Sequence, residues 1–250
     1  MSISIVLVGI SHPGNIGSAA RAMKTMGLSS LRLVAPARFP ATEATVMAAG
    51  ADDVLAGARV YTDVAGAVAD CGLIVGATSR ARHLPWRVVE PREAAREIAP
   101  ASRDGEVAIL FGAERTGLLN EDIERCQLLL AIPTGASYAS LNVAMAVQVV
   151  AYEVLLALRD AGAAAATRGI QLASATEMER FYAHFEAVME EVDFRDRTGE
   201  GHLMARIRRL FNRAVMDQNE VNILRGILTS VQGRRRRAGE PPATRAEEPR

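Results

Sequence analysis

Short apolar runs alternate with amphipathic segments along the first 160 residues. The runs are continuous stretches rich in Val, Ile and Leu, which is typical of parallel strands covered on both faces. They fall at residues 4–9, 31–35, 72–78, 106–112 and 128–133. Helical spacing separates them, most clearly at residues 16–26, 63–70, 90–98 and 140–160. This order predicts an α/β fold with a doubly wound parallel sheet over residues 1–160.

The pattern changes after this segment. Residues 160–169 are small and lack large apolar side chains, so we expect a linker, bounded at 161–172. Residues 173–233 carry three sets of apolar positions at helical spacing and no strand pattern, which predicts a small three-helix extension. Residues 234–250 hold six Arg and three Glu with almost nothing to bury, so we expect this tail to be disordered.

Composition narrows the class of protein. The 29 basic and 29 acidic residues cancel, so any affinity for nucleic acid must come from local Arg clusters. No segment has the length and apolarity of a membrane span, and the N-terminus lacks the pattern of a signal peptide. Cys71 and Cys126 have no metal-binding spacing, and the four His form no cluster. We therefore expect a cytoplasmic protein with reduced thiols, no membrane contact and no structural metal.

Three predicted strands end in glycine and small polar residues, at GATS (76–79), FGAERTG (111–117) and IPTG (132–135). Ligands of doubly wound sheets bind beyond the carboxyl ends of strands, so these ends predict a shared crevice. The alternative is that the glycines only make turns. Neither GxGxxG after a strand nor GxxxxGK[ST] is present, which disfavours NAD and ATP. An adenosine cofactor held by backbone atoms remains open.

Few charged side chains lie near these strand ends. Glu114 follows a strand directly, where it could serve the site or only brace the loop. Arg21 and Lys24 are three residues apart and share a face of the first predicted helix. The loop at 79–86 places arginines beside the only tryptophan, a combination suited to gripping phosphate and stacking a base. One face of a later helix carries Arg206, Arg209 and Arg213. For every one of these arginines, a solvated surface is the alternative.

Three ordered segments at these residues resemble the motifs of the SpoU (TrmH-like) RNA 2′-O-ribose methyltransferases of the SPOUT superfamily. They are NIGSAARAMKTMG (15–27), ILFGAERTGLLNEDIERC (109–126) and IPTGASYASLNVAMAVQVVAYE (132–153). The loop ATSRARHLPW (77–86) and the helical extension resemble the bacterial members that methylate the ribose of nucleotide 32 in the tRNA anticodon loop. The resemblance implies 2′-O-methylation of a cytidine or uridine there, with S-adenosyl-L-methionine (AdoMet) as methyl donor.

The resemblance also implies a SPOUT domain with a deep trefoil knot at its carboxyl end, an exception to the rule against knots. It implies a homodimer through the first and last helices of the domain, with one subunit's Arg21 near the other's cofactor. Cofactor contacts carried over by motif fall on Thr78, Ser79, Arg80, Gly112, Ile132, Ser140, Leu141 and Asn142.

The catalytic set implied by the resemblance is Arg21, Glu114, Ser140 and Asn142. A charged guanidinium has no lone pair for a proton, so we expect Arg21 to clamp a phosphate and orient the hydroxyl rather than act as a base. Candidates for RNA contact are Arg82, Arg115, Lys24, Arg206, Arg209 and Arg213. The alternatives are methylation of another tRNA or rRNA site, a non-catalytic RNA-binding protein of this fold, or a small-molecule enzyme of nucleotide-binding type.

Overall fold

The computed structural model describes residues 2–79, 86–135, 140–162, 171–194 and 202–239. In them, seven strands form one sheet in the order β3-β2-β1-β6-β4-β7-β5, and every pairing is parallel. The strands are β1 (Ile3–Val8), β2 (Ser30–Val34), β3 (Arg59–Tyr61), β4 (Cys71–Ala77), β5 (Val88–Val89), β6 (Glu106–Phe111) and β7 (Leu128–Leu130). The prediction of an α/β fold built on a parallel sheet is therefore confirmed.

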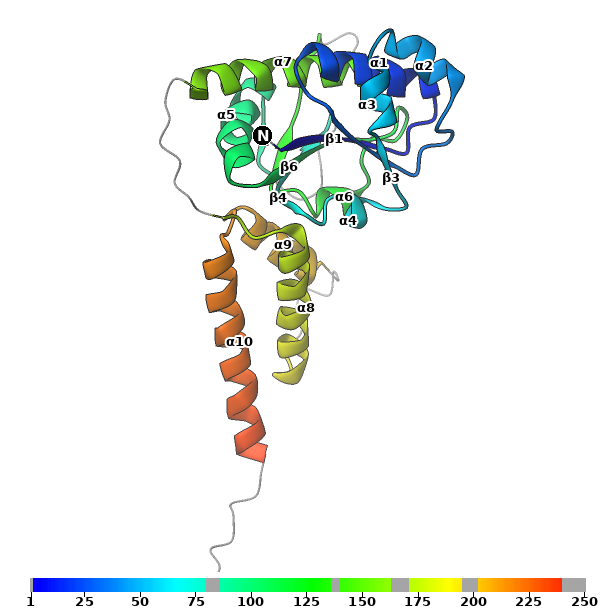
Figure 1. Cartoon of the computed structure of the whole chain (residues 1–250). Coiled ribbons are helices and arrows are strands. Elements are labelled where there is room, and N and C mark those ends of the chain that lie inside the picture. Colours follow the sequence, from blue (N-terminus) through cyan, green and yellow to red (C-terminus); the bar gives the residue numbers. More distant parts are fainter. Residues whose placement is uncertain (1, 80–85, 136–139, 163–170, 195–201, 240–250) are drawn as a thin grey trace, which may run out of the picture.

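Helices cover both faces of this sheet, which is why its strands are apolar without alternation (Figure 1). The larger core lies under α1 (Pro13–Thr25), α2 (Thr42–Ala48), α3 (Asp52–Ala56), α5 (Pro91–Asp104) and α7 (Val143–Gly162). The opposite face is covered by two short helices, α4 (Val64–Ala67) and α6 (Asn120–Ile123). The remaining three helices lie below α4 and α6 in Figure 1.

These three helices are α8 (Ala175–Glu191), α9 (Leu203–Asn212) and α10 (Gln218–Gly239), as the extension predicts. They have a core of their own, in which Phe181 makes an edge-on contact with Phe211, their ring centroids 4.9 Å apart. α8 and α10 run in the same direction, as two hydrogen bonds between them show. Gln218 donates to Glu177 near the start of both helices, and Gln232 donates to Glu191 further along both. The predicted division into a sheet domain and a helical extension stays a prediction, and the separate cores of the two parts are consistent with it.

Some boundaries differ from the sequence pattern. α10 continues to Gly239, so a disordered tail beginning at 234 is wrong for its first residues; the chain beyond 239 lies outside the described residues. α7 extends to Gly162, slightly into the predicted linker, and β7 stops at Leu130 instead of 133. The pattern missed β3 and β5, which are short edge strands with few buried residues, and the short helices α2, α3 and α6. The predicted knot would be formed by the loops near 76–80, 111–117 and 132–142. Residues 80 and 136–139 of these loops lie outside the described chain, so the knot stays a prediction.

One buried charge lies on the smaller core face. Arg32 of β2 is 1% exposed, pairs with both oxygens of Asp70 and donates 2.6 Å to the carbonyl of Ala67. Glu106 lies 3.4 Å from the same guanidinium. The Nε of Arg32 is buried without a hydrogen-bond partner among the described residues. A guanidinium this buried depends on its carboxylates, since a lone buried charge is costly.

Candidate functional site

The predicted crevice would lie at the carboxyl ends of three strands that are neighbours in the sheet. β4 lies between β6 and β7, with Gly76 opposite both Leu110 and Leu129. The carboxyl ends of these three strands are therefore adjacent, although they are far apart in the chain. The N–H of Thr78 donates to the carbonyl of Leu130 at 2.9 Å and continues the pairing to the edge. Sequence reasoning expected this convergence of the three glycine-containing ends, and the sheet order provides it.

Gly112 shapes the loop after β6. Residues Ala113 and Gly117 form a bridge closed by a 2.8 Å hydrogen bond, so the chain turns back over the strand end. A Cβ on Gly112 would lie 2.1 Å from the carbonyl carbon of Gly117 and 2.1 Å from the nitrogen of Leu118. Backbone cannot yield as a side chain can, so this close approach requires glycine.

Glu114 connects this loop to the start of α1. Its Oε2 accepts from the N–H of Ser11 at 3.1 Å, and its Oε1 accepts from the N–H of His12 at 3.3 Å and from Nδ2 of Asn15 at 2.8 Å. Burial raises the pKa of Glu114, but the hydrogen bonds from these donors together lower it by more. The pKa of Glu114 therefore lies below its usual range. These three donors and the positive end of a helix stabilise the charged carboxylate, which connects the loop to α1.

Asn142 continues the chain of hydrogen bonds. Its Oδ1 accepts from the N–H of Ala144 at 2.8 Å and so caps the amino end of α7. Its Nδ2 donates to Oδ1 of Asn15 at 3.0 Å. Glu114, Asn15 and Asn142 thus form one relay, in which Asn15 donates on one side and accepts on the other. The relay joins all three motif segments.

Asn15 is the residue that sequence reasoning missed. It stands at the first position of the quoted motif at 15–27 but was not singled out. The available signal was an amide at the start of a helix whose N-cap residue, His12, makes no side-chain cap. Its partners lie 99 and 127 residues away, so no local pattern could identify them.

The other predicted cofactor contacts lie around these strand ends. Thr78 and Ile132 are half-buried, Ser79 and Ser140 are exposed, and Leu141 is 37% exposed at the mouth of α7. Aliphatic surface beside hydroxyl groups suits an adenosine, whose flat base is apolar on its faces and whose ribose is polar. The residues that the structure describes here therefore fit AdoMet. Arg80 and Arg82 lie outside the described residues.

The predicted RNA contacts divide between two parts of the molecule. Lys24 forms a 2.7 Å ion pair with Asp53 of α3. An RNA phosphate would therefore compete with Asp53 for this ammonium group. Arg115 is exposed in the loop after β6. On α9, Arg206 and Arg213 are exposed and Arg209 is half-buried. Whether any of these contacts RNA remains a prediction.

Arg21 does not share a face with Asn15. Six positions along an α-helix turn it by about 240°, so Arg21 projects away from the relay of its own subunit. Its side chain is exposed. This orientation is compatible with the expectation that Arg21 serves the site of a second subunit, which stays untested.

None of the described helices has the length and apolarity needed to cross a membrane. Across the same described residues, no group of three or more His, Cys, Asp or Glu could hold a metal ion.

Comparisons with known proteins agree with the three motifs. Residues 2–152 match the model of the SpoU rRNA Methylase family, and residues 176–242 match the C-terminal domain of the tRNA methyltransferase TrmJ. The tRNA (cytidine/uridine-2′-O-)-methyltransferase TrmJ of Sodalis glossinidius is 47% identical over 235 residues, covering 92% of this chain and 91% of its own. A Pseudomonas aeruginosa relative, named for cytidine, uridine and adenosine, is 43% identical over 92% of this chain and 93% of its own.

Solved structures support the same assignment. The crystal structure of TrmJ from Z. mobilis ZM4 superposes with a TM-score of 0.80 at 33% identity, covering 93% of this chain and all of that one. The similarity therefore extends over the sheet and the C-terminal helices together.

Proposed function

Because the chain belongs to the SpoU methylase family, with TrmJ enzymes as relatives along its whole length, we propose that it methylates the ribose 2′-hydroxyl of a tRNA nucleotide. The observation that carries the proposal is the relay from Glu114 through Asn15 to Asn142 at the three strand ends. It holds the segments around a surface suited to AdoMet. We propose that the methylated nucleotide is a cytidine or uridine at position 32 of the anticodon loop. We propose the cytoplasm, where tRNA resides, as the location of the protein.

The cofactor supplies a methyl group on a sulfonium, a good leaving group, so the chain's task is mainly positioning. Thr78, Ser79, Gly112, Ile132, Ser140 and Leu141 would hold it, together with Arg80 from the undescribed loop. Glu114 and Asn142 keep the loop and the mouth of α7 in place for binding. Their polar atoms are already engaged, so neither takes the ribose proton.

Arg21 is proposed to bind the phosphate next to the reacting ribose. Its guanidinium stays charged at neutral pH and can grip a phosphate with two parallel donors. This grip orients the 2′-hydroxyl, and the proton leaves late, to phosphate oxygen or water. Arg21→Lys keeps the charge but loses the fork, so methyl transfer should fall by at least about tenfold while AdoMet affinity is unchanged. Arg59→Lys, at an exposed site on β3, is the matched control.

A homodimer through α1 and α7 follows from the same proposal. α7 carries exposed apolar side chains at Met145, Val149 and Tyr152, which a second subunit would cover. Mixing Arg21→Lys and Asn142→Ala subunits tests the shared site. If Arg21 serves its partner, each mixed dimer has one intact site, and an equal mixture recovers about a quarter of wild-type activity. If Arg21 serves its own subunit, no activity returns.

Labelled AdoMet with tRNA transcripts, followed by mapping of the methylated nucleotide, tests the reaction itself. Methylation at nucleotide 32 supports the full proposal, and methylation elsewhere supports only the chemistry. An absence of AdoMet binding, with tRNA still bound, would favour a non-catalytic RNA-binding protein. Replacing the base at that nucleotide by adenosine tests the wider range named for the Pseudomonas relative.

The C-terminal helices are proposed to contribute RNA affinity through α9. An Arg206→Gln/Arg213→Gln variant removes two exposed cations from one face, so the salt dependence of tRNA binding should weaken by about one to two in slope. An Arg59→Gln/Arg225→Gln variant removes two exposed arginines elsewhere and should leave the slope unchanged.

A further inference from the structure

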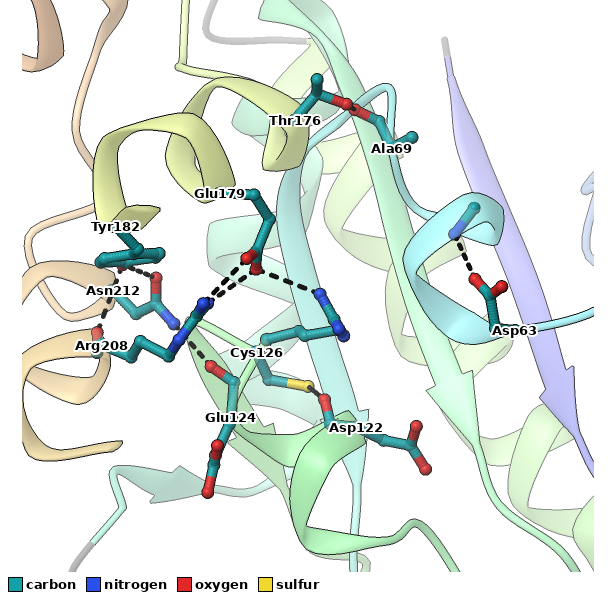
Figure 2. A network of polar contacts seen from close by, with 12 residues as sticks. Asp63, Ala69, Asp122, Glu124, Cys126, Thr176, Glu179, Tyr182, Arg208 and Asn212 are labelled. Atoms are coloured by element: carbon teal, nitrogen blue, oxygen red, sulfur yellow. Dashed lines mark hydrogen bonds and ion pairs between the residues drawn. The ribbon is translucent and has the colours of Figure 1, made fainter. Parts of the chain in front are cut away.

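One carboxylate joins the C-terminal helices to the sheet domain. Glu179 of α8 forms two bonds with Arg208 of α9, at 2.7 and 2.8 Å, and accepts from Nη1 of Arg125 at 3.0 Å (Figure 2). Arg125 lies just after α6, in the sheet domain. The bidentate pair lies inside the helical extension, whereas the bond to Arg125 crosses between the two parts.

A second connection ends on the adjoining residue. The hydroxyl of Tyr182 donates to Oδ1 of Asn212 at 2.7 Å, and Nδ2 of Asn212 donates to the carbonyl of Glu124 at 3.0 Å. Arg208 lies over the ring of Tyr182, 4.5 Å from its centroid, and so belongs to the same cluster. The two connections end on the adjoining residues Arg125 and Glu124, directly after α6, and Figure 2 shows Asn212 bonded to Glu124. A further bond, from Thr176 to the carbonyl of Ala69, secures the start of α8.

The contact between the two parts contains buried apolar side chains and a pocket. A cavity of about 170 Å³ lies between α4 and the start of α8, with Val68, Ile74 and Met178 among its lining residues. Apolar contacts are not directional, so the polar contacts are the ones that can fix the orientation of the two parts. Arg125 and Glu179 are 30% and 38% exposed, so water and salt reach this pair.

The segment that receives these contacts continues from the loop that shapes the site. That loop begins at Gly112, contains Glu114 and leads into α6, whose start is tied by a 2.9 Å bond from the N–H of Leu119 to Asp122. The N–H of Cys126 then bonds the carbonyl of Ile123. The cross-domain contact is therefore separated from the cofactor loop by a single short helix.

We propose that Arg125 and Glu179 are positioning residues, which set the orientation of the C-terminal helices over the sheet domain and thereby the way a bound tRNA is presented to the methyl-transfer site. The consequence for tRNA rests on the proposed function; the consequence for orientation does not. Neither residue touches cofactor or substrate, and both act through the placement of α9.

Arg125→Gln is the sharper variant, because it leaves the Glu179–Arg208 pair intact within the helical extension. The KM for full-length tRNA should rise about fivefold, as expected for loss of one partly exposed charge-assisted bond, with kcat within about twofold and AdoMet affinity unchanged. Glu179→Gln also weakens the pair with Arg208, so it should raise the KM at least as much, and Glu179→Asp should restore part of the loss. Arg180→Gln, an exposed arginine on α8, controls for the loss of positive charge.

Orientation is measured separately by energy transfer between dyes on Arg59→Cys and Ser230→Cys, at exposed positions on β3 and α10. Cys71 and Cys126 are buried and should not be labelled. Arg125→Gln should broaden the distance distribution, and 1 M NaCl should broaden that of the wild type, while Arg180→Gln should not.

An unchanged distribution in Arg125→Gln overturns the proposal whether or not the protein methylates tRNA. A broadened distribution with an unchanged KM, or an equal rise in KM for Arg180→Gln, overturns its link to tRNA. If no RNA is methylated, the proposed function fails while the orientation result still stands.

Discussion

Replacing Glu114 by glutamine tests the relay without changing the size of the side chain. The carboxylate accepts three hydrogen bonds, from Ser11, His12 and Asn15, all at the start of α1. Glutamine has one oxygen to accept with. If that oxygen keeps the bonds to His12 and Asn15, its NH₂ group faces the N–H of Ser11, and two donors oppose each other.

The magnitude follows from these contacts. Two charge-assisted bonds become neutral ones, at about 0.5 kcal/mol each, and one bond is lost, at about 1 kcal/mol because water reaches the half-buried site. The free energy of unfolding should therefore fall by about 2 kcal/mol at pH 7, which corresponds to a Tm lower by about 4–8 °C for a chain of this size. AdoMet affinity should fall as well, since the loop that carries Gly112 loses its brace.

The sign of the pH dependence is also determined. The pKa of Glu114 is depressed in the folded state, so its contribution is present above the unfolded pKa of about 4.3 and is lost as pH falls through the folded pKa. The gap between wild type and Glu114→Gln should close on acidification. Urea unfolding followed by circular dichroism at pH 7 and pH 3 measures both values, with Glu121→Gln, an exposed carboxylate on α6, as the control. The reasoning is refuted if Glu114→Gln is as stable as Glu121→Gln at pH 7, or if the gap persists in acid.

Two further predictions concern stability and the cofactor loop. Asp70→Asn should destabilise the fold by about 2–3 kcal/mol because it leaves Arg32 buried with less counter-charge, whereas Arg32→Met should cost about 1 kcal/mol or less, since Asp70 is half-exposed and can be hydrated; thermal unfolding decides, and the opposite order would contradict this account. Gly112→Ala should abolish AdoMet binding in calorimetry through its clash with the loop backbone, while Gly105→Ala, which meets nothing within 4 Å, should bind normally; equal binding by both would show that the close approach at Gly112 is dispensable.

Local sequence patterns were sufficient for much of this molecule. Continuous apolar runs identified β1, β2, β4, β6 and β7, because a strand covered on both faces is apolar along most of its length. Helical spacing located α7 to α10, and the arginines at 206, 209 and 213 were correctly placed on one face of a helix. The edge strands β3 and β5 were missed because they are short and mostly exposed, and so lack a continuous apolar run; β7 is equally short but fully buried.

The residues of the site could be predicted only in part from the sequence. Glycines at three strand ends predicted a crevice, but the hydrogen bonds among Glu114, Asn15 and Asn142 depend on which strands are neighbours. Because β4 lies between β6 and β7 and β1 lies beside β6, residues 99 to 127 positions apart are brought within hydrogen-bond distance. Asn15 is an amide at the start of a helix, but nothing near it in the sequence identifies its distant partners.

The same distinction applies to the C-terminal helices. The sequence by itself determined that they are amphipathic and which faces are apolar. Only the tertiary structure decided that Arg208, on the face of α9 opposite the predicted stripe, would meet Glu179, and that Glu179 would also reach Arg125. Periodicity records whether a position is buried, whereas the choice of a partner for a charge depends on how separately folded parts pack, and that information is spread over the whole chain.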